Sequence, residues 1–262
     1  MHIAGYIASL FIGISLGLIG GGGSILTVPV LVYLFGVNPT LATAYSLFVV
    51  GTSSLVGVIP KYFSKDIHWR AAFFFGIPSI MAVFSTRFWI VPHIPDSISL
   101  VGLISMHKAN FIMVFFALLM LAAAYSMIRF NNADTAEASS PKMHFFILML
   151  LGLVVGLVAG LVGAGGGFLI IPVLVFFAQL PMNKAIGTSL LIISAQSLIG
   201  FSGDFLHIQI DWLFLVSITA IAVVGLLLGV RIGRGVPPAE LKKGFGWFVL
   251  AIAIYVLFKE LL

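Results

Sequence analysis

Two clusters of glycine, at residues 20–23 and 163–167, contain the residues best suited to holding a ligand. Each cluster precedes an apolar segment of about 13 residues, which as an α-helix would reach about 20 Å of a 30 Å hydrocarbon core. One end of each segment must then lie at depth, where non-helical backbone is tolerated only against protein or water. We expect helices beginning at Ser24 and Gly167 to offer free N–H groups and partial positive charge to an anion. The candidate residues in these clusters are Gly22, Gly23, Ser24, Gly165, Gly166 and Gly167.

A second interpretation of the glycines is close helix packing, which small residues commonly allow in membranes. The two clusters, however, precede short segments at matching places in the two halves of the chain. This pairing favours a binding site over packing alone.

Hydrogen-bonding side chains follow in the next apolar segment of each half. Ser46 and Ser53 are seven residues apart and share one helix face, as do Ser189 and Gln196. These four side chains could line one cavity. Alternatively, serine can bond back to its own helix, and Gln196 can be satisfied by a neighbouring helix.

Charged and metal-binding groups are sparse. No Asp, Glu, Lys or Arg falls in the middle of an apolar segment, so we expect neutral donors and dipoles to hold an anion, without an evident proton relay. Asp204 and Asp211 lie at segment edges and are better interpreted as interfacial residues than as coupling groups. The chain has no cysteine, and its six histidines form no HxxxH or HExxH pair. The sequence therefore predicts no metal, no cofactor and no enzyme activity.

Composition places these residues in lipid. Of 262 residues, 61% are hydrophobic and only 8% are charged, far below the roughly one quarter usual for soluble domains. The net charge of +5 comes from 13 basic residues spread between apolar segments, which is typical of orientation signals and not of nucleic-acid binding. We predict an all-α integral membrane protein with ten transmembrane segments, at 3–20, 24–36, 41–60, 70–90, 109–128, 144–163, 167–180, 185–203, 211–230 and 244–261.

The chain contains an internal repeat. A shift of 143 positions aligns GLIGGGGSILTVPVLV, starting at Gly17, with GLVGAGGGFLIIPVLV, starting at Gly160, and ten of the sixteen positions are identical. The same shift aligns Trp69 with Trp212. We divide the chain into a first repeat (1–128), a cytoplasmic linker (129–143) and a second repeat (144–262).

The basic residues indicate how the repeats are oriented. If all ten segments cross, ten basic residues lie on one side and three on the other, whereas re-entrant second and seventh segments give seven against six. The first arrangement agrees with the rule that cytoplasmic loops are basic. Five crossings per half then make the repeats inverted, with both termini outside the cytoplasm.

On its glycine motifs and on AIGTSL, which starts at Ala185, the sequence resembles the sulfite exporter TauE/SafE family of bacterial and archaeal membrane proteins. The resemblance covers essentially the whole chain and is least distinctive from 91 to 108 and in the segment that follows. It implies transport of small sulfur-containing anions, such as sulfite, thiosulfate, sulfonates or sulfoacetate, across the cytoplasmic (inner) membrane of a prokaryote. By the same resemblance, Thr188 and Ser189 border the substrate path.

The leading functional hypothesis is alternating access around a midplane anion site. The alternatives are an anion channel and a carrier of another small organic anion. The expected partners are the anion and the lipid bilayer, with no nucleic acid, and the coupling proton or ion and the oligomeric state are left open.

Overall fold

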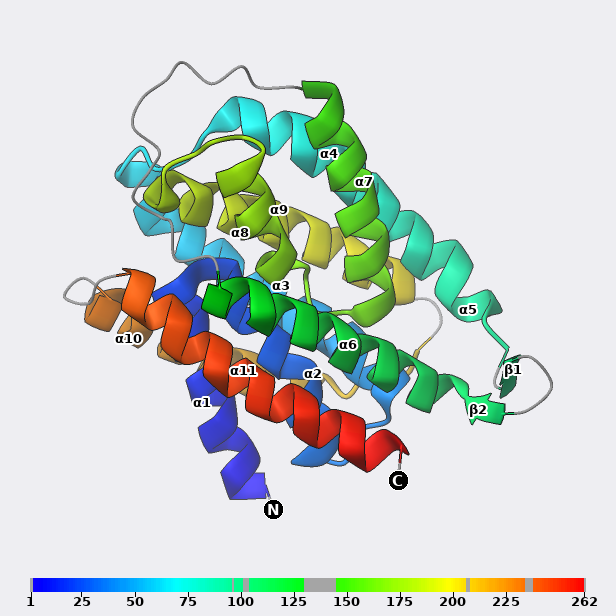
Figure 1. Ribbon diagram of the computed structural model, residues 1–262. Helices are drawn as coiled ribbons and strands as arrows, with labels where there is room; N and C mark the ends of the chain where they lie inside the picture. The colour runs from blue at the N-terminus through cyan, green and yellow to red at the C-terminus, as the bar shows by residue number, and fades with distance from the viewer. Residues whose placement is uncertain are drawn as a thin grey trace.

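Helices dominate the fold and follow the apolar segments of the sequence (Figure 1). A computed structural model describes residues 2–95, 97–100, 104–129, 145–205, 208–233 and 238–261. The predicted cytoplasmic linker lies almost entirely outside these residues. Within them, seven helical runs are long and apolar enough to cross a membrane, and a helix occupies each of the ten predicted segments. The number of crossings stays a prediction.

The first run contains α1 (His2–Ile19), a 3₁₀ segment (Gly20–Leu26) and α2 (Thr27–Tyr33). The third run contains α4 (Trp69–Ser85), a π-helical turn (Thr86–Ile90) and α5 (Val91–His93). The other long runs are α3 (Pro39–Phe63), α6 (Lys108–Arg129), α7 (Phe145–Val162), α9 (Met182–Asp204) and α10 (Trp212–Ile232). Two further helices are α8 (Gly167–Phe176), which has only 10 residues, and α11 (Pro238–Leu261), which has 24.

A small antiparallel hairpin departs from the all-α prediction. Strand β1 (Ser97–Leu100) pairs with β2 (Ile104–His107), with Ser97 opposite His107. The sequence alternates polar and apolar residues from Ser97 to Leu100, which is the period of a strand. The hairpin lies between α5 and α6, in the stretch where the family resemblance is least distinctive.

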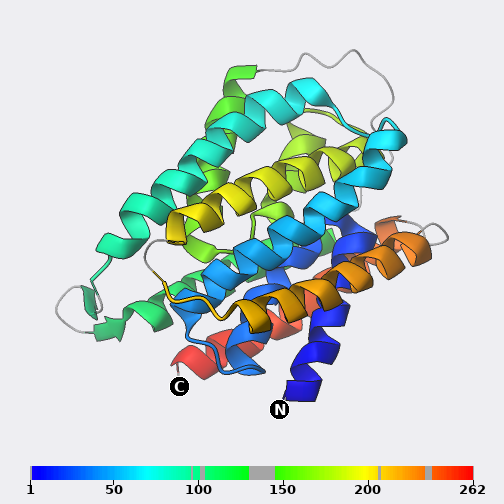
Figure 2. The same cartoon turned by 180° about the vertical axis from the view of Figure 1, so that it is seen from behind.

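Six helices pack one after another in the order α7, α4, α9, α3, α10, α1. Figure 2 shows the four central members of this series side by side, and Figure 1 shows α6 packed along α11 on the opposite side. The 3₁₀ segment and α8 contact each other between these two groups. Under the 143-residue shift, α1 corresponds to α7, α4 to α10 and α3 to α9. Exchanging the two repeats therefore gives the same series read from its other end, with the same neighbours in contact.

Repeat-mate helices α3 and α9 run antiparallel. A Cβ added to Gly57, in the second half of α3, would lie 3.4 Å from Leu190, in the first half of α9. A Cβ added to Gly200, in the second half of α9, would lie 3.4 Å from Leu47, in the first half of α3. The two contacts are also equivalent under the repeat shift.

Equivalent helix starts are capped by equivalent residues. His68 Nδ1 accepts a 3.2 Å hydrogen bond from Ala71 N at the start of α4. At the corresponding start of α10, Asp211 Oδ1 accepts a 3.1 Å bond from Phe214 N. Each cap satisfies a backbone donor that has no partner within its helix.

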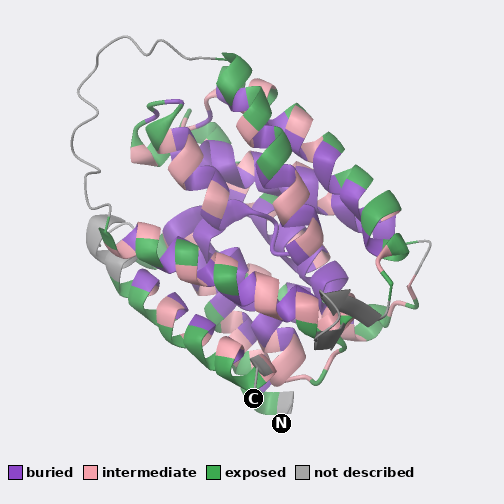
Figure 3. Cartoon of the chain, turned by 45° about the vertical axis from the view of Figure 1, so that its right-hand side comes forward, coloured by how far each residue is buried: buried purple, intermediate pink, exposed green. Residues whose placement is uncertain are grey.

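Buried residues occupy the middle of the bundle and exposed residues its outer faces (Figure 3). The outer faces carry large apolar side chains, including Leu213 (86% exposed), Phe146 (79%) and Phe63 (77%). Such a surface would be unfavourable in water and matches the hydrocarbon core of a bilayer.

Candidate functional site

The two glycine motifs meet in the interior of the protein. A Cβ added to Gly167 would lie 2.2 Å from the carbonyl oxygen of Gly21, and a Cβ added to Gly21 would lie 2.7 Å from Gly167 Cα. Real side chains do not approach this closely, so the two backbones touch only because both residues are glycine. The sequence predicted that the glycine clusters face the interior, and the structure places them in contact there.

The first motif differs from its predicted shape. Ser24 does not begin a helix, because it lies inside the 3₁₀ segment that joins α1 to α2. Its hydroxyl donates to Gly21 O at 2.8 Å. Gly20, the first residue of this segment, has a φ of 72°, so the chain turns out of α1 before it reaches Ser24. The helical start in this motif is therefore at Gly20 and not at Ser24, and anion binding there stays a prediction.

Gly22 and Gly23 in this motif fit the close-packing interpretation. A Cβ on Gly23 would lie 2.4 Å from Leu16 N on α1, and one on Gly22 would lie 3.1 Å from Ile19. Both glycines let the 3₁₀ segment fold tightly against the end of α1. The polar side chain nearest to Gly23 is that of Ser15 on α1, whose Oγ would lie 2.5 Å from the added Cβ.

The second motif matches its prediction more closely. Gly163, Gly165 and Gly166 all have positive φ, between 65° and 72°, and α8 begins at Gly167. No side chain caps the start of α8. The chain therefore breaks between α7 and α8, and this break requires glycine conformations.

Gln196 lies against this break and is bonded on both sides of its amide. Its Nε2 donates to Gly165 O, and its Oε1 accepts a 2.5 Å hydrogen bond from Ser79 Oγ on α4. A Cβ on Gly166 would lie 3.2 Å from Gln196 Nε2. The structure thus unites three predicted residues, Gly165, Gly166 and Gln196, and adds Ser79, which the sequence analysis missed.

Several serine hydroxyls near the repeat-mate helices have no hydrogen-bond partner. Ser46, Ser53 and Ser54 on α3 and Ser197 on α9 are fully buried, and their Oγ atoms are unpartnered. A Cβ on Gly165 would lie 2.8 Å from Ser197 Oγ. Buried polar atoms are usually satisfied, so these hydroxyls are candidates to bond a ligand or water.

Two other predicted residues, Thr188 and Ser189, lie nearer the start of α9 than Gln196 does. Thr188 Oγ1 accepts a 2.9 Å hydrogen bond from His68 N, at the connection between α3 and α4. Ser189 Oγ bonds to Ile186 O in its own helix, at 2.9 Å, as the alternative interpretation of the serines allowed. Thr188 is eight residues from Gln196, which is about 12 Å along the helix axis. The predicted residues therefore extend over two levels and do not form one cluster.

A buried ion pair lies near the ends of two predicted segments, where the sequence analysis expected only interfacial charges. Arg87 and Asp204 are 1% and 7% exposed at their side chains, and Arg87 Nη1 lies 3.1 Å from Asp204 Oδ2. Arg87 Nη1 also donates to Thr43 Oγ1 at 3.0 Å. Arg87 lies inside the third helical run, Trp69–His93, so a full cation is present within a membrane-spanning element. Asp204 is not an ordinary interfacial residue.

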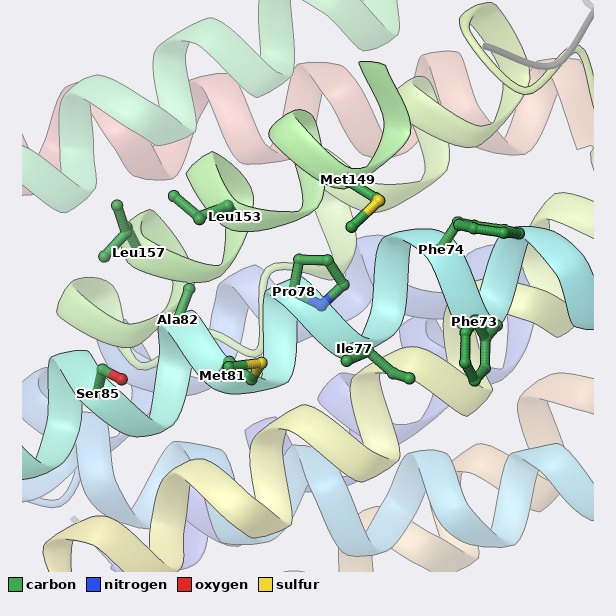
Figure 4. Close-up of a pocket in the computed structure, with 10 residues that line it drawn as sticks. All are labelled: Phe73, Phe74, Ile77, Pro78, Met81, Ala82, Ser85, Met149, Leu153 and Leu157. Atoms are coloured by element: carbon green, nitrogen blue, oxygen red, sulfur yellow. The ribbon is translucent and has the colours of Figure 1, made fainter. Parts of the chain in front are cut away.

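The described surface hollows lie elsewhere. One is a groove between α4 and α7, lined by apolar side chains such as Phe73, Pro78, Met149 and Leu153 (Figure 4). A second lies along α4 and α9 near Ile77 and Leu191. Both linings are mostly apolar and suited to lipid acyl chains, and Arg70 at the edge of the second is the one charged residue among them.

An apolar helical bundle with polar groups and a glycine-lined chain break in its interior defines a polytopic membrane protein of the transporter class. The model of the protein family described as "Sulfite exporter TauE/SafE" matches residues 6–256. The chain belongs to this family.

Relatives in bacteria and archaea support the same class. The chain is 30% identical over 258 residues to a "Probable membrane transporter protein" of Xylella fastidiosa (strain 9a5c), covering 95% of this chain and 92% of the relative. A probable membrane transporter protein of Methanocaldococcus jannaschii is 26% identical over 252 residues, covering 90% and 88%. YjnA of Bacillus subtilis (strain 168), with the same description, is 22% identical over 262 residues and covers 98% of each chain. No solved structure gives a significant match.

Proposed function

We propose that this protein is a secondary transporter of small sulfur-containing anions, of the sulfite, thiosulfate, sulfonate or sulfoacetate class. Membership of the sulfite exporter family supports this substrate class. The observation most important to the proposal is the set of unpartnered hydrogen-bond donors buried inside an otherwise apolar bundle. Donors without partners in a low-dielectric interior are suited to an anion that has left its hydration shell.

We infer that the two repeats are inverted and move against each other in alternating access. The antiparallel run of α3 and α9 and the exchangeable helix packing order support this arrangement. The contact between Gly21 and Gly167 joins the repeats through backbone alone. A contact that involves few side chains can change when one bundle rocks against the other.

The substrate path is proposed to run beside the second glycine motif, bordered by Gly165, Gly166 and the hydroxyls of α3 and α9. These groups lie on both repeats, as a site between inverted repeats requires. Gly167, at the start of α8, would add backbone N–H groups and the positive end of a helix dipole.

Transport into proteoliposomes tests the function. Purified protein would be reconstituted, and uptake of sulfite, thiosulfate and methanesulfonate measured separately, with and without a proton gradient. We expect saturable uptake of at least one of these anions. Flux of a cation or sugar with none of the anions would refute the substrate class. Large unitary currents in electrical recordings would favour an anion channel over a carrier.

A further inference from the structure

Arg87 and its neighbour Thr86 carry buried hydrogen-bond donors that have no acceptor in the protein. Arg87 is fully buried, and its Nε and Nη2 atoms have no hydrogen-bond partner, although Nη1 is bonded to Asp204 and Thr43. The hydroxyl of the neighbouring Thr86 is also buried and unpartnered. A guanidinium inside a membrane-spanning element is costly to desolvate, and leaving two of its nitrogens without an acceptor adds to that cost.

The two free nitrogens lie on one edge of the planar guanidinium. Nε and Nη2 together present two parallel N–H donors, the geometry that matches two oxygens of one oxyanion. Asp204 and Thr43 hold the opposite nitrogen, Nη1, and so fix the orientation of the plane. The protein therefore fixes one edge of Arg87 and leaves the bidentate edge unused.

The site lies where the second glycine motif begins. A Cβ added to Gly163 would lie 2.4 Å from the Cβ of Thr43 and 2.5 Å from Arg87 Nη2. Gly160 lies about one helical turn earlier, and a Cβ added to it would lie 2.7 Å from the Cβ of Thr86. The unpartnered donors therefore face the end of α7, directly before the break that leads to α8.

The repeat provides a comparison within the same chain. Under the 143-residue shift, Gly163 corresponds to Gly20, Thr43 to Ile186 and Arg87 to Val230. A Cβ on Gly20 would lie 2.8 Å from Ile186, so the same contact is made there by an apolar side chain. At the mate of Asp204 stands Lys61, which forms a separate partly exposed pair with Asp66 at 3.3 Å.

The comparison between the repeats bears on whether the Arg87–Asp204 pair has a structural role or a binding role. Ile186 fills the equivalent place beside Gly20 with an apolar side chain, so the close contact at the glycine motif does not itself require a polar group there. Buried ion pairs are often no more stabilising than well-packed apolar residues of similar size. The charges in one repeat therefore call for a reason other than packing.

We propose that Arg87 binds the transported oxyanion through its Nε and Nη2 atoms, and that Asp204 and Thr43 are positioning residues that hold the guanidinium in place. This inference rests on the proposed function and assigns it a cation. The ligand class is a small oxyanion with at least two exposed oxygens on one centre, such as sulfite or a sulfonate. In the present conformation the site is closed by Gly163, so binding requires the α7–α8 break to move.

Binding measurements on paired variants test the inference. Sulfite binding to purified protein in detergent would be measured by isothermal titration calorimetry, with sodium chloride as the ionic-strength control. Arg87→Gln should weaken sulfite binding by about 10- to 100-fold, because charge-assisted hydrogen bonds are lost. Arg87→Lys keeps the charge without the planar fork and should give an intermediate loss. Asp204→Asn keeps an amide oxygen that can accept from Arg87 Nη1 and removes a competing negative charge, so it should bind sulfite at least as tightly as the wild type.

Two further variants separate binding from folding. Arg87→Gln leaves Asp204 buried without its partner, so the double variant Arg87→Gln with Asp204→Asn removes both charges and keeps a polar amide at each position. It should fold and bind sulfite as weakly as Arg87→Gln alone. Thr219→Val, which removes a buried hydroxyl bonded only within its own helix, is the matched control and should bind like the wild type.

The outcomes distinguish this inference from the proposed function. Wild-type sulfite affinity in the double variant would overturn the role of Arg87 and leave the transporter intact. Equal loss of affinity in Arg87→Gln and Asp204→Asn would assign the pair a purely structural role, also overturning the inference. If the wild-type protein binds none of sulfite, thiosulfate and methanesulfonate, the proposed function and this inference both fail.

Discussion

Ser79 Oγ on α4 donates a 2.5 Å hydrogen bond to Gln196 Oε1 on α9, which lies 117 positions later in the chain. The same amide donates to Gly165 O, so one side chain joins two helices to the break before α8. Both Ser79 and Gln196 are fully buried. The glycine break is therefore held by a polar contact that crosses between the repeats.

Gln196→Leu should destabilise the protein, because Ser79 and Gly165 O would each lose a partner in a buried setting. The expected cost is about 1–3 kcal/mol for each unsatisfied group. Thermal unfolding in mild detergent would measure it, and a double-mutant cycle with Ser79→Ala would isolate the pair. Ser202→Ala, which removes an exposed hydroxyl bonded within its own helix, is the control. Equal stability of Gln196→Leu and wild type would contradict the interpretation.

Gly167→Ala should loosen the contact between the two glycine motifs. Its Cβ would overlap Gly21 O, and because backbone cannot rotate away as a side chain can, the 3₁₀ segment must shift. Overpacking of this kind typically costs about 1–3 kcal/mol. We expect a lower thermal midpoint and slower sulfite uptake in proteoliposomes. Gly244→Ala, where nothing lies within 4 Å of the added Cβ, should leave both unchanged.

Larger substitutions at Gly23 and Gly166 test the motifs for transport itself. Gly23→Val would collide with Leu16 N, and Gly166→Val would place a β-branched residue at a φ of 65° beside Gln196. We expect both variants to insert into the membrane and to lose transport. Membrane fractionation and uptake assays would measure the two properties separately. Wild-type flux in both variants would reduce the motifs to packing.

The cap at the start of α4 should make stability depend on pH. Burial lowers the pKa of His68, and the nearby cations Lys184 and Arg70 lower it further. The folded state therefore prefers neutral His68, whose Nδ1 can accept from Ala71 N. This contribution is complete above the unfolded pKa of about 6.5 and is lost as pH falls through the lower folded value.

We expect the thermal midpoint to fall between pH 7.5 and pH 5, and His68→Asn to reduce that fall. Asparagine caps helices well and does not titrate in this range. His93→Asn, at an exposed position, is the control and should keep the wild-type pH dependence. An unchanged pH dependence in His68→Asn would show that this cap does not contribute.

The sequence located the helices because a bilayer sets the length of apolar segment that can cross it, and this length is visible in composition. It also located the second glycine break, since positive φ at Gly163, Gly165 and Gly166 needs glycine. It did not show that in the first motif the chain turns at Gly20 and enters a 3₁₀ segment ahead of Ser24. The two motifs have nearly the same residues, and the matching Gly20 and Gly163 both have a positive φ, but in the second motif Gly165 and Gly166 have positive φ as well.

Arg87 was missed because its partner lies in the other repeat. Near the end of an apolar segment, a cation resembles an interfacial residue until its partner and burial are known. Asp204, 117 positions away, supplies both the charge and the contact. One signal was available in the sequence: the repeat shift places Arg87 opposite Val230, a charge where the other half needs none.

Single cysteines can test whether the repeats are inverted, because the chain contains no cysteine of its own. Lys65 lies between α3 and α4, and Gln209 lies between α9 and α10, in the corresponding stretch of the second repeat; both are exposed. The proposed topology places Lys65 in the cytoplasm and Gln209 outside. In intact cells, a membrane-impermeant maleimide should label Gln209→Cys and should label Lys65→Cys only after permeabilisation. Labelling of both from the same side would end the inverted-repeat proposal and, with it, the argument that α3 and α9 enclose a site reached alternately from two sides.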